Sequence, residues 1–97
     1  MFLAKVVGTV VSSRKTELLV GRKLLVVEPV DFDQQQPEGK PLVAVDSVGA
    51  GEGEVVLVVQ GSSARLTEST QDTPCDASIM AIVDYIEIDG RRTFAKS

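Results

Sequence analysis

The sequence contains no histidine, no tryptophan and no asparagine, and its single cysteine is Cys75. The missing histidine removes the commonest general base and the commonest metal ligand. One cysteine excludes a disulfide or a thiolate metal cluster within one chain, and without asparagine there is no N-glycosylation sequon. We therefore expect no cofactor and no metal, no enzymatic activity, and a reducing, intracellular environment.

Long apolar runs and an excess of positive charge are also absent. The first eleven residues are apolar but include Lys5, whereas a signal peptide has its charge ahead of an uninterrupted apolar region. The segment is also too short to span a bilayer. The net charge of −4 argues against binding to phosphate backbones, so we expect neither a membrane nor a nucleic-acid partner. Basic side chains concentrate in residues 1–27 and acidic ones in 28–54, which either gives two differently charged faces or is simply a solvated surface.

Valine, leucine and isoleucine supply most of the 43% hydrophobic content, which favours strands over helices. Residues 2–11 alternate as in a half-buried strand. Residues 23–32 begin as a second strand, and Pro29 indicates that this strand is at an edge, is bulged, or ends there. Residues 42–48 and 54–60 are two further strands, predicted to form a hairpin around the glycine-rich stretch 49–53. Residues 74–80 allow a short helix with Asp76 as its N-cap.

The last segment predicts a second hairpin. Asp89-Gly90 is a favoured pair for a two-residue type I′ turn. That turn would place Ile88 opposite Arg91, Glu87 opposite Arg92, and Tyr85 opposite Phe94. The fold expected for residues 1–97 is therefore a single, mostly β domain: a small five-stranded OB-like barrel with one short helix and a C-terminal hairpin.

Two strands do not fit a solitary barrel. The runs Leu24–Val27 and Val55–Val59 are apolar on both faces, whereas a barrel wall buries only its inner face. Something must cover the outside, and another subunit is the simplest cover for so short a chain.

The glycine-rich stretch resembles a nucleotide site only superficially. Gly49, Gly51 and Gly53 are followed by Glu54 and a strand, whereas a P-loop continues with Gly-Lys-Ser/Thr into a helix. The glycines instead supply positive φ or let another backbone approach closely. The second turn consists of Gly61, Ser62, Ser63, Ala64 and Arg65. Its serines have no histidine base, and Arg65 is expected to pair with a carboxylate within or between subunits.

The segment DSVGAGEGEVVLVVQGSSAR (46–65) closely resembles the vertex proteins of bacterial microcompartment shells, the EutN/CcmL family. The opening residues 1–11, residues 23–27, Asp76-Ala77 and residues 81–84 match as well, so the resemblance covers nearly the whole chain. Cys75 departs from it, since an aliphatic residue is expected there.

The resemblance implies a non-catalytic ring of five subunits at the vertices of a polyhedral shell in the bacterial cytoplasm, with separate hexameric proteins tiling the facets. By position, residues 61–65 would lie near subunit contacts around the fivefold axis and residues 49–53 in a tight loop within the ring. The alternative is an OB-like module that binds a nucleic acid or a small ligand, although four aromatic residues offer little for base stacking.

Overall fold

The computed structural model describes residues 1–13, 17, 21–61 and 77–96, and these contain strands but no α-helix. The strands are β1 (Phe2–Val10), β2 (Lys23–Pro29), β3 (Leu42–Asp46), β4 (Val55–Gln60), β5 (Ala77–Ile82), β6 (Tyr85–Ile88) and β7 (Arg91–Ala95). The predicted mostly β architecture is confirmed.

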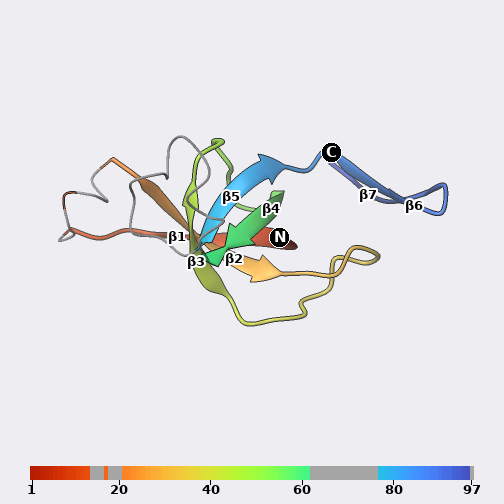
Figure 1. Ribbon diagram of the computed structural model, residues 1–97, viewed down its shortest axis with the longest axis horizontal. Helices are drawn as coiled ribbons and strands as arrows, with labels where there is room; N and C mark the ends of the chain where they lie inside the picture. The colour runs from red at the N-terminus through yellow and green to blue at the C-terminus, as the bar shows by residue number, and fades with distance from the viewer. Residues whose placement is uncertain (14–16, 18–20, 62–76, 97) are drawn as a thin grey trace.

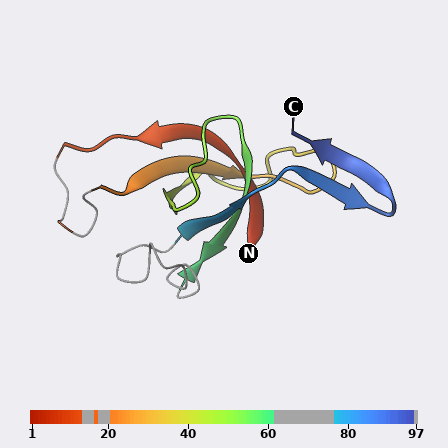
Figure 2. The ribbon, with the colours of Figure 1, turned by 90° about the horizontal axis from the view of Figure 1, so that it is seen from above.

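The first five strands form a closed barrel in the order β1-β2-β3-β5-β4, with β4 pairing back to β1. All pairs are antiparallel except β3 with β5. This is the predicted five-stranded OB-like barrel. Strands β6 and β7 form a separate hairpin that projects from one end of the barrel (Figures 1 and 2).

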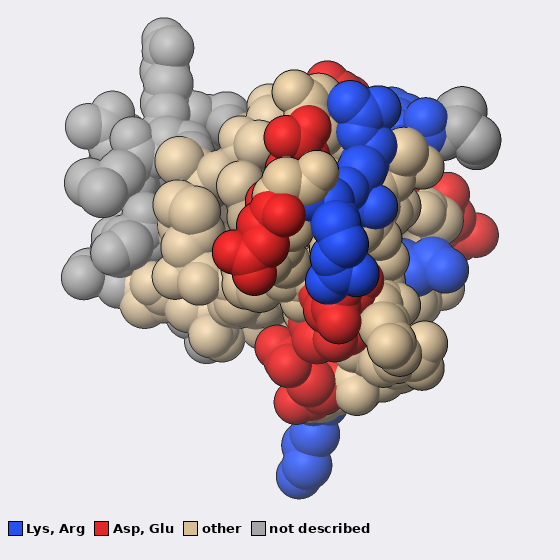
Figure 3. Space-filling model, turned by 90° about the vertical axis from the view of Figure 1, so that its right-hand side faces the viewer, with Lys and Arg blue, Asp and Glu red and all other residues tan. Residues whose placement is uncertain are grey.

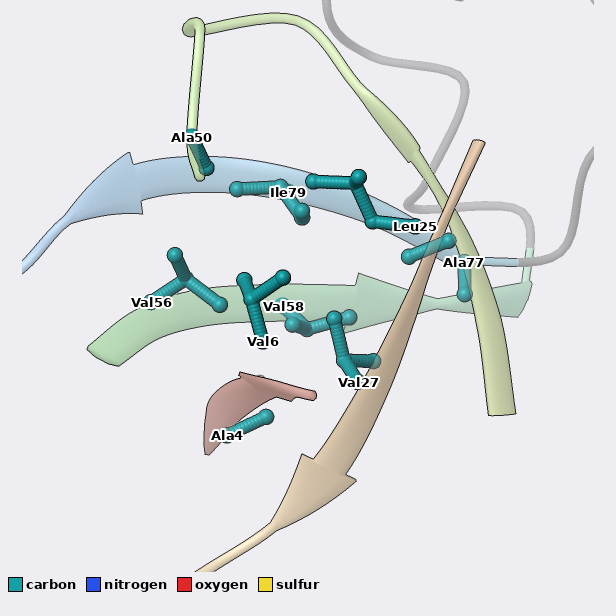
Figure 4. Packing of buried hydrophobic residues seen from close by; sticks show 10 residues of the cluster. Ala4, Val6, Leu25, Val27, Ala50, Val56, Val58, Ala77 and Ile79 are labelled. Carbon is teal, nitrogen blue, oxygen red and sulfur yellow. The ribbon is translucent and has the colours of Figure 1, made fainter. Parts of the chain in front are cut away.

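Small aliphatic side chains fill the barrel. Its core consists of Ala4, Val6, Leu25, Val27, Ala44, Ala50, Val56, Val58, Ala77 and Ile79. Each strand contributes alternate residues, as the period of two requires. The sticks in Figure 4 come from all sides of the barrel and converge on its axis. Because most of these residues are valine or alanine, the strands can close tightly around a narrow interior.

A second, smaller cluster lies outside the barrel wall. Leu3, Val30 and Val55 are buried there, with Leu57, Val83, Ile86 and Phe94 packed against them. The chain itself therefore covers the outer side of β4 at Val55, where we expected another subunit. The outer side of β2 differs, because Leu24 and Val26 remain half-buried.

The glycine-rich stretch does not join a hairpin, so that prediction was wrong. Strands β3 and β4 are not paired with each other, because β5 lies between them. The helix predicted over residues 74–80 was also wrong for its described part. Residues Ala77–Ile82 form β5, and pairing on both sides with burial of Ala77 and Ile79 outweighs the local capping signal.

The C-terminal hairpin is confirmed, with one change of register. Asp89 and Gly90 have φ values of 52° and 77°, as a type I′ turn requires, and Ile88 and Glu87 face Arg91 and Arg92 as predicted. A bulge after Ile86 then shifts the pairing, so Ile86 rather than Tyr85 faces Phe94. The shift places both side chains against the second cluster, a larger gain than one cross-strand aromatic pair.

Candidate functional site

The loop between β3 and β4 closes one end of the barrel. Gly49 and Gly53 have φ values of 81° and 87°, which confirms the expected positive φ at these two glycines. Between them Ala50 is fully buried and belongs to the barrel core. Figure 4 shows its methyl group pointing from the loop toward Ile79 and Val56. The glycines thus turn the backbone sharply enough to insert Ala50 into the barrel.

Lys23 and Asp46 hold the start of this loop. The Lys23 ammonium donates a hydrogen bond of 2.6 Å to the Ala50 carbonyl and lies 3.7 Å from the Asp46 carboxylate. The Asp46 side chain, only 2% exposed, accepts hydrogen bonds from the amides of Val48 and Gly49. One half-exposed lysine therefore links the end of β3 to the buried turn.

Glu54 and Lys96 hold the end of the loop. The Glu54 carboxylate accepts a 2.8 Å hydrogen bond from the Gly51 amide and lies 2.6 Å from the Lys96 ammonium. The Lys96 hydrogen bond, with help from the Gly51 amide, holds the pKa of Glu54 below its usual value. The same bond raises the pKa of Lys96. This contact ties the C-terminal hairpin to the glycine loop.

Several amides of the loop are engaged by the chain itself. The amides of Val48 and Gly49 donate hydrogen bonds to the Asp46 carboxylate. The Gly51 amide donates to the Glu54 carboxylate, and the Gly53 amide donates a hydrogen bond of 2.8 Å to the Val6 carbonyl. A phosphate site needs such amides free, whereas here they bind groups of the chain itself and the Glu54 carboxylate lies in the loop. The geometry supports the structural interpretation of these glycines.

The remaining predicted residues lie apart from the loop or outside the described part. Gly61 follows β4 directly and has a φ of 68°. Residues Ser62, Ser63, Ala64 and Arg65 lie outside the described residues, as does Cys75. A role for either glycine segment in subunit contacts stays a prediction.

Sequence reasoning missed Lys23, Glu54 and Lys96 as the side chains that hold the loop. The contacts of Lys23 with Ala50 and of Lys96 with Glu54 join residues far apart in the sequence, so they leave no periodic signal. Asp46 could have been found, because an aspartate whose side chain binds the amide two residues on is a recurrent turn element.

The surface offers charges of both signs. The end of the molecule that carries the hairpin shows a row of lysine and arginine atoms flanked by carboxylates (Figure 3). Arg91 lies 4.0 Å from Asp33, and Arg92 lies 3.9 Å from Glu87 and stacks over the Tyr85 ring at 4.3 Å. In the described ranges, no group of three or more Asp, Glu, Cys or His side chains could hold a metal ion. Nor does that part of the chain have a helix long and apolar enough to cross a membrane.

A closed five-stranded barrel in this strand order, with Ala50 of its glycine loop in the core, is a β-barrel domain of OB-like topology. The chain belongs to the family described as ethanolamine utilisation protein EutN/carboxysome, whose model matches residues 1–84. The C-terminal hairpin lies beyond that match.

Individual relatives are similar in sequence to this chain over most of their length. The chain is 48% identical to the bacterial microcompartment shell vertex protein GrpN of Rhodospirillum rubrum, over 90% of this chain and 97% of that one. It is 43% identical to the shell vertex protein EutN of Salmonella typhimurium, over 99% and 96% of the two chains.

Solved structures share the fold. CcmL of Nostoc sp. PCC 7120 superimposes with a TM-score of 0.92 at 43% identity, covering 99% of this chain and 100% of that one. The structure of GrpN, described as a pentameric microcompartment shell protein, gives a TM-score of 0.80 at 49% identity over 91% and 99% of the chains.

Proposed function

We propose that this protein is a structural subunit of a bacterial microcompartment shell, in which five copies form a ring that closes a vertex. The observation that carries the proposal is the agreement with shell vertex proteins over nearly the whole chain, including a pentameric one. The protein then acts by association rather than by catalysis. Its place is in the shell, within the bacterial cytoplasm.

The proposed partners are further copies of this chain and the hexameric proteins that tile the facets. A cyclic ring needs a heterologous interface, in which one patch of a subunit meets a different patch of its neighbour. Two features of the chain support such an association: Leu24 and Val26 on the outer side of β2 are half-buried, and Val43 beside them is 46% exposed. No cofactor, membrane or nucleic acid takes part in this function.

The alternative function, an OB-like binding module, is less well supported. OB folds bind oligonucleotides on the face of their second and third strands, using aromatic platforms and a basic groove. Here that face carries Val26 and Val43, and the ammonium of Lys23 is engaged by Ala50 and Asp46. The face suits a protein surface better than a nucleic acid.

Native mass spectrometry of the purified protein tests the proposal. We expect a complex of five subunits that is unaffected by added single-stranded oligonucleotide. A stable monomer at all concentrations would contradict the ring, and a monomer that shifts in mass with the oligonucleotide would favour the binding module.

The turn of residues 61–65 is proposed to lie near the fivefold axis. Replacing Ser63 with glutamate would then bring five like charges close together, and like charges at short range repel. We expect Ser63→Glu to lose the ring while circular dichroism shows an intact barrel. Unchanged assembly in size-exclusion chromatography would contradict this placement of the turn, and Ser63→Gln is the uncharged control of similar size.

A further inference from the structure

Neither crowding nor a positive φ requires the glycine at position 8 in the barrel wall. Gly8 lies inside β1, and its φ is not in the positive region where glycine is favoured. A Cβ built there would lie 3.7 Å from the Cβ of Val26 and 3.8 Å from its Cγ2, which is ordinary van der Waals contact. Alanine would therefore fit, and a glycine inside a strand weakens it. Such a glycine often marks a bulge or a place where another backbone approaches closely, and the β1 bulge lies beside Gly8.

The residues opposite Gly8 on the next two strands are apolar and face outward. Gly8 is opposite Val26, and Val26 is opposite Val43 on the next strand, so the three share one face of the sheet. The neighbours of Val26 along β2, Leu25 and Val27, point into the barrel core, so this shared face is the outer one.

A bulge in β1 adds a further valine beside this glycine. The register passes from Val6 to Gly8, so the bulge leaves Val7 without a partner on β2. Val7 and Val43 are each 46% exposed. We call Val7, Gly8, Val26 and Val43 the valine face. None of the four is charged, and they extend across three adjacent strands.

A second copy of this chain is the occupant that fits this surface. The valine face offers neither charge nor aromatic stacking, so an apolar protein surface complements it. The similar GrpN chain is described as pentameric, and a ring presents each subunit with two neighbours. We propose that the valine face is one half of the contact between neighbouring subunits, and that backbone of the neighbour passes over Gly8. The inference rests on the proposed function, because it names the surface through which the ring would form.

Two substitutions test the contact from different directions. Gly8→Leu fills the space above the strand with an apolar side chain, and Val43→Glu places a charge on the face. Both side chains point to solvent in the single subunit, so the barrel should remain folded by circular dichroism. Val11→Glu is the matched control, because Val11 is 90% exposed and lies just beyond β1.

The readout is the concentration at which the ring dissociates, measured by native mass spectrometry and sedimentation. We expect it to rise by at least about tenfold for Gly8→Leu and Val43→Glu, and to stay unchanged for Val11→Glu. If both test variants assemble like the wild type, the proposed contact is wrong while the ring stands. If the wild type itself is monomeric, the proposed function fails first.

A labelling experiment covers the case in which a test variant does not fold. In a Cys75→Ser background, Val43→Cys and Val11→Cys are treated with a bulky thiol reagent under conditions where the ring is intact. We expect Val43→Cys to react at least about tenfold more slowly than Val11→Cys, because a contact excludes the reagent. Equal rates would overturn the proposal.

Discussion

Replacing Lys23 with methionine tests whether one side chain secures the closed end of the barrel. The substitution keeps most of the aliphatic stem and removes the ammonium that binds the Ala50 carbonyl and the Asp46 carboxylate. A hydrogen bond to a charged group contributes about 1.5–3 kcal/mol. The Lys23 side chain is 49% exposed, so the ion pair with Asp46 adds less than about 1 kcal/mol. We expect Lys23→Met to lower the free energy of unfolding by about 2 kcal/mol.

The assay is urea denaturation followed by circular dichroism. All variants are compared at one protein concentration, because dissociation of an oligomer changes its apparent stability. Lys40→Met is the matched control, since Lys40 is an exposed lysine in the loop between β2 and β3, and its loss should stay within about 0.5 kcal/mol. In an Asp46→Asn background, Lys23→Met should cost less, because the ion pair is already gone. A loss no larger than that of Lys40→Met would refute the role assigned to Lys23.

Two further predictions concern the same loop. Because the pKa of Glu54 is lowered, its contribution to stability is complete above its ordinary value of 4.5 and is lost as the pH falls through the lowered pKa. The raised pKa of Lys96 makes the opposite prediction, a contribution that is complete below 10.5 and lost as the pH rises through the raised pKa. Lys96→Met should therefore show a flatter dependence of the free energy of unfolding on pH at both the acidic and the basic end. If this free energy, measured by urea denaturation at each pH, changes equally with pH in the two proteins, the contact is contradicted. Gly49→Ala should cost about 1–2 kcal/mol, because its φ of 81° strains any residue with a Cβ. Gly51→Ala is its control: Gly51 has no positive φ, and its Cβ would lie 3.5 Å from the Glu54 carboxylate, so equal losses in thermal denaturation would show that φ is not what requires Gly49.

The fold was predictable where local patterns coincide with the tertiary structure. The alternation in residues 2–11 and the Asp89-Gly90 turn follow from short-range rules, and β1 and the hairpin turn lie where these rules place them. Of the three alternatives that Pro29 left open, the structure shows the end of β2. The errors arose where pairing with strands distant in sequence determines the structure of a segment. Nothing local in residues 77–82 indicates that β5 inserts between β3 and β4, so a weak helix signal prevailed.

The candidate site was predictable only in part, for a similar reason. Positive φ at Gly49 and Gly53 follows from glycine itself, whereas the burial of Ala50 depends on the closed barrel beneath it. The contact of Lys96 with Glu54 depends on where the hairpin returns to the barrel. Such contacts become visible only once the strand order is known.

The parallel seam between β3 and β5 has a consequence for how the protein is made. Two register pairs, Val45 with Ser78 and Asp46 with Ile79, close the barrel there, reinforced by a hydrogen bond from Ser47 to the Ile79 carbonyl across 32 positions of sequence. Pairings between segments far apart in the sequence form late in folding, because the entropy of loop closure is lost before the new contacts stabilise the chain. During synthesis, β1 to β4 are therefore made before β5, the strand that pairs with both β3 and β4. Until residues 77–82 have emerged from the ribosome, the barrel stays open between β3 and β4, and the nascent subunit has no complete barrel wall with which to contact another subunit.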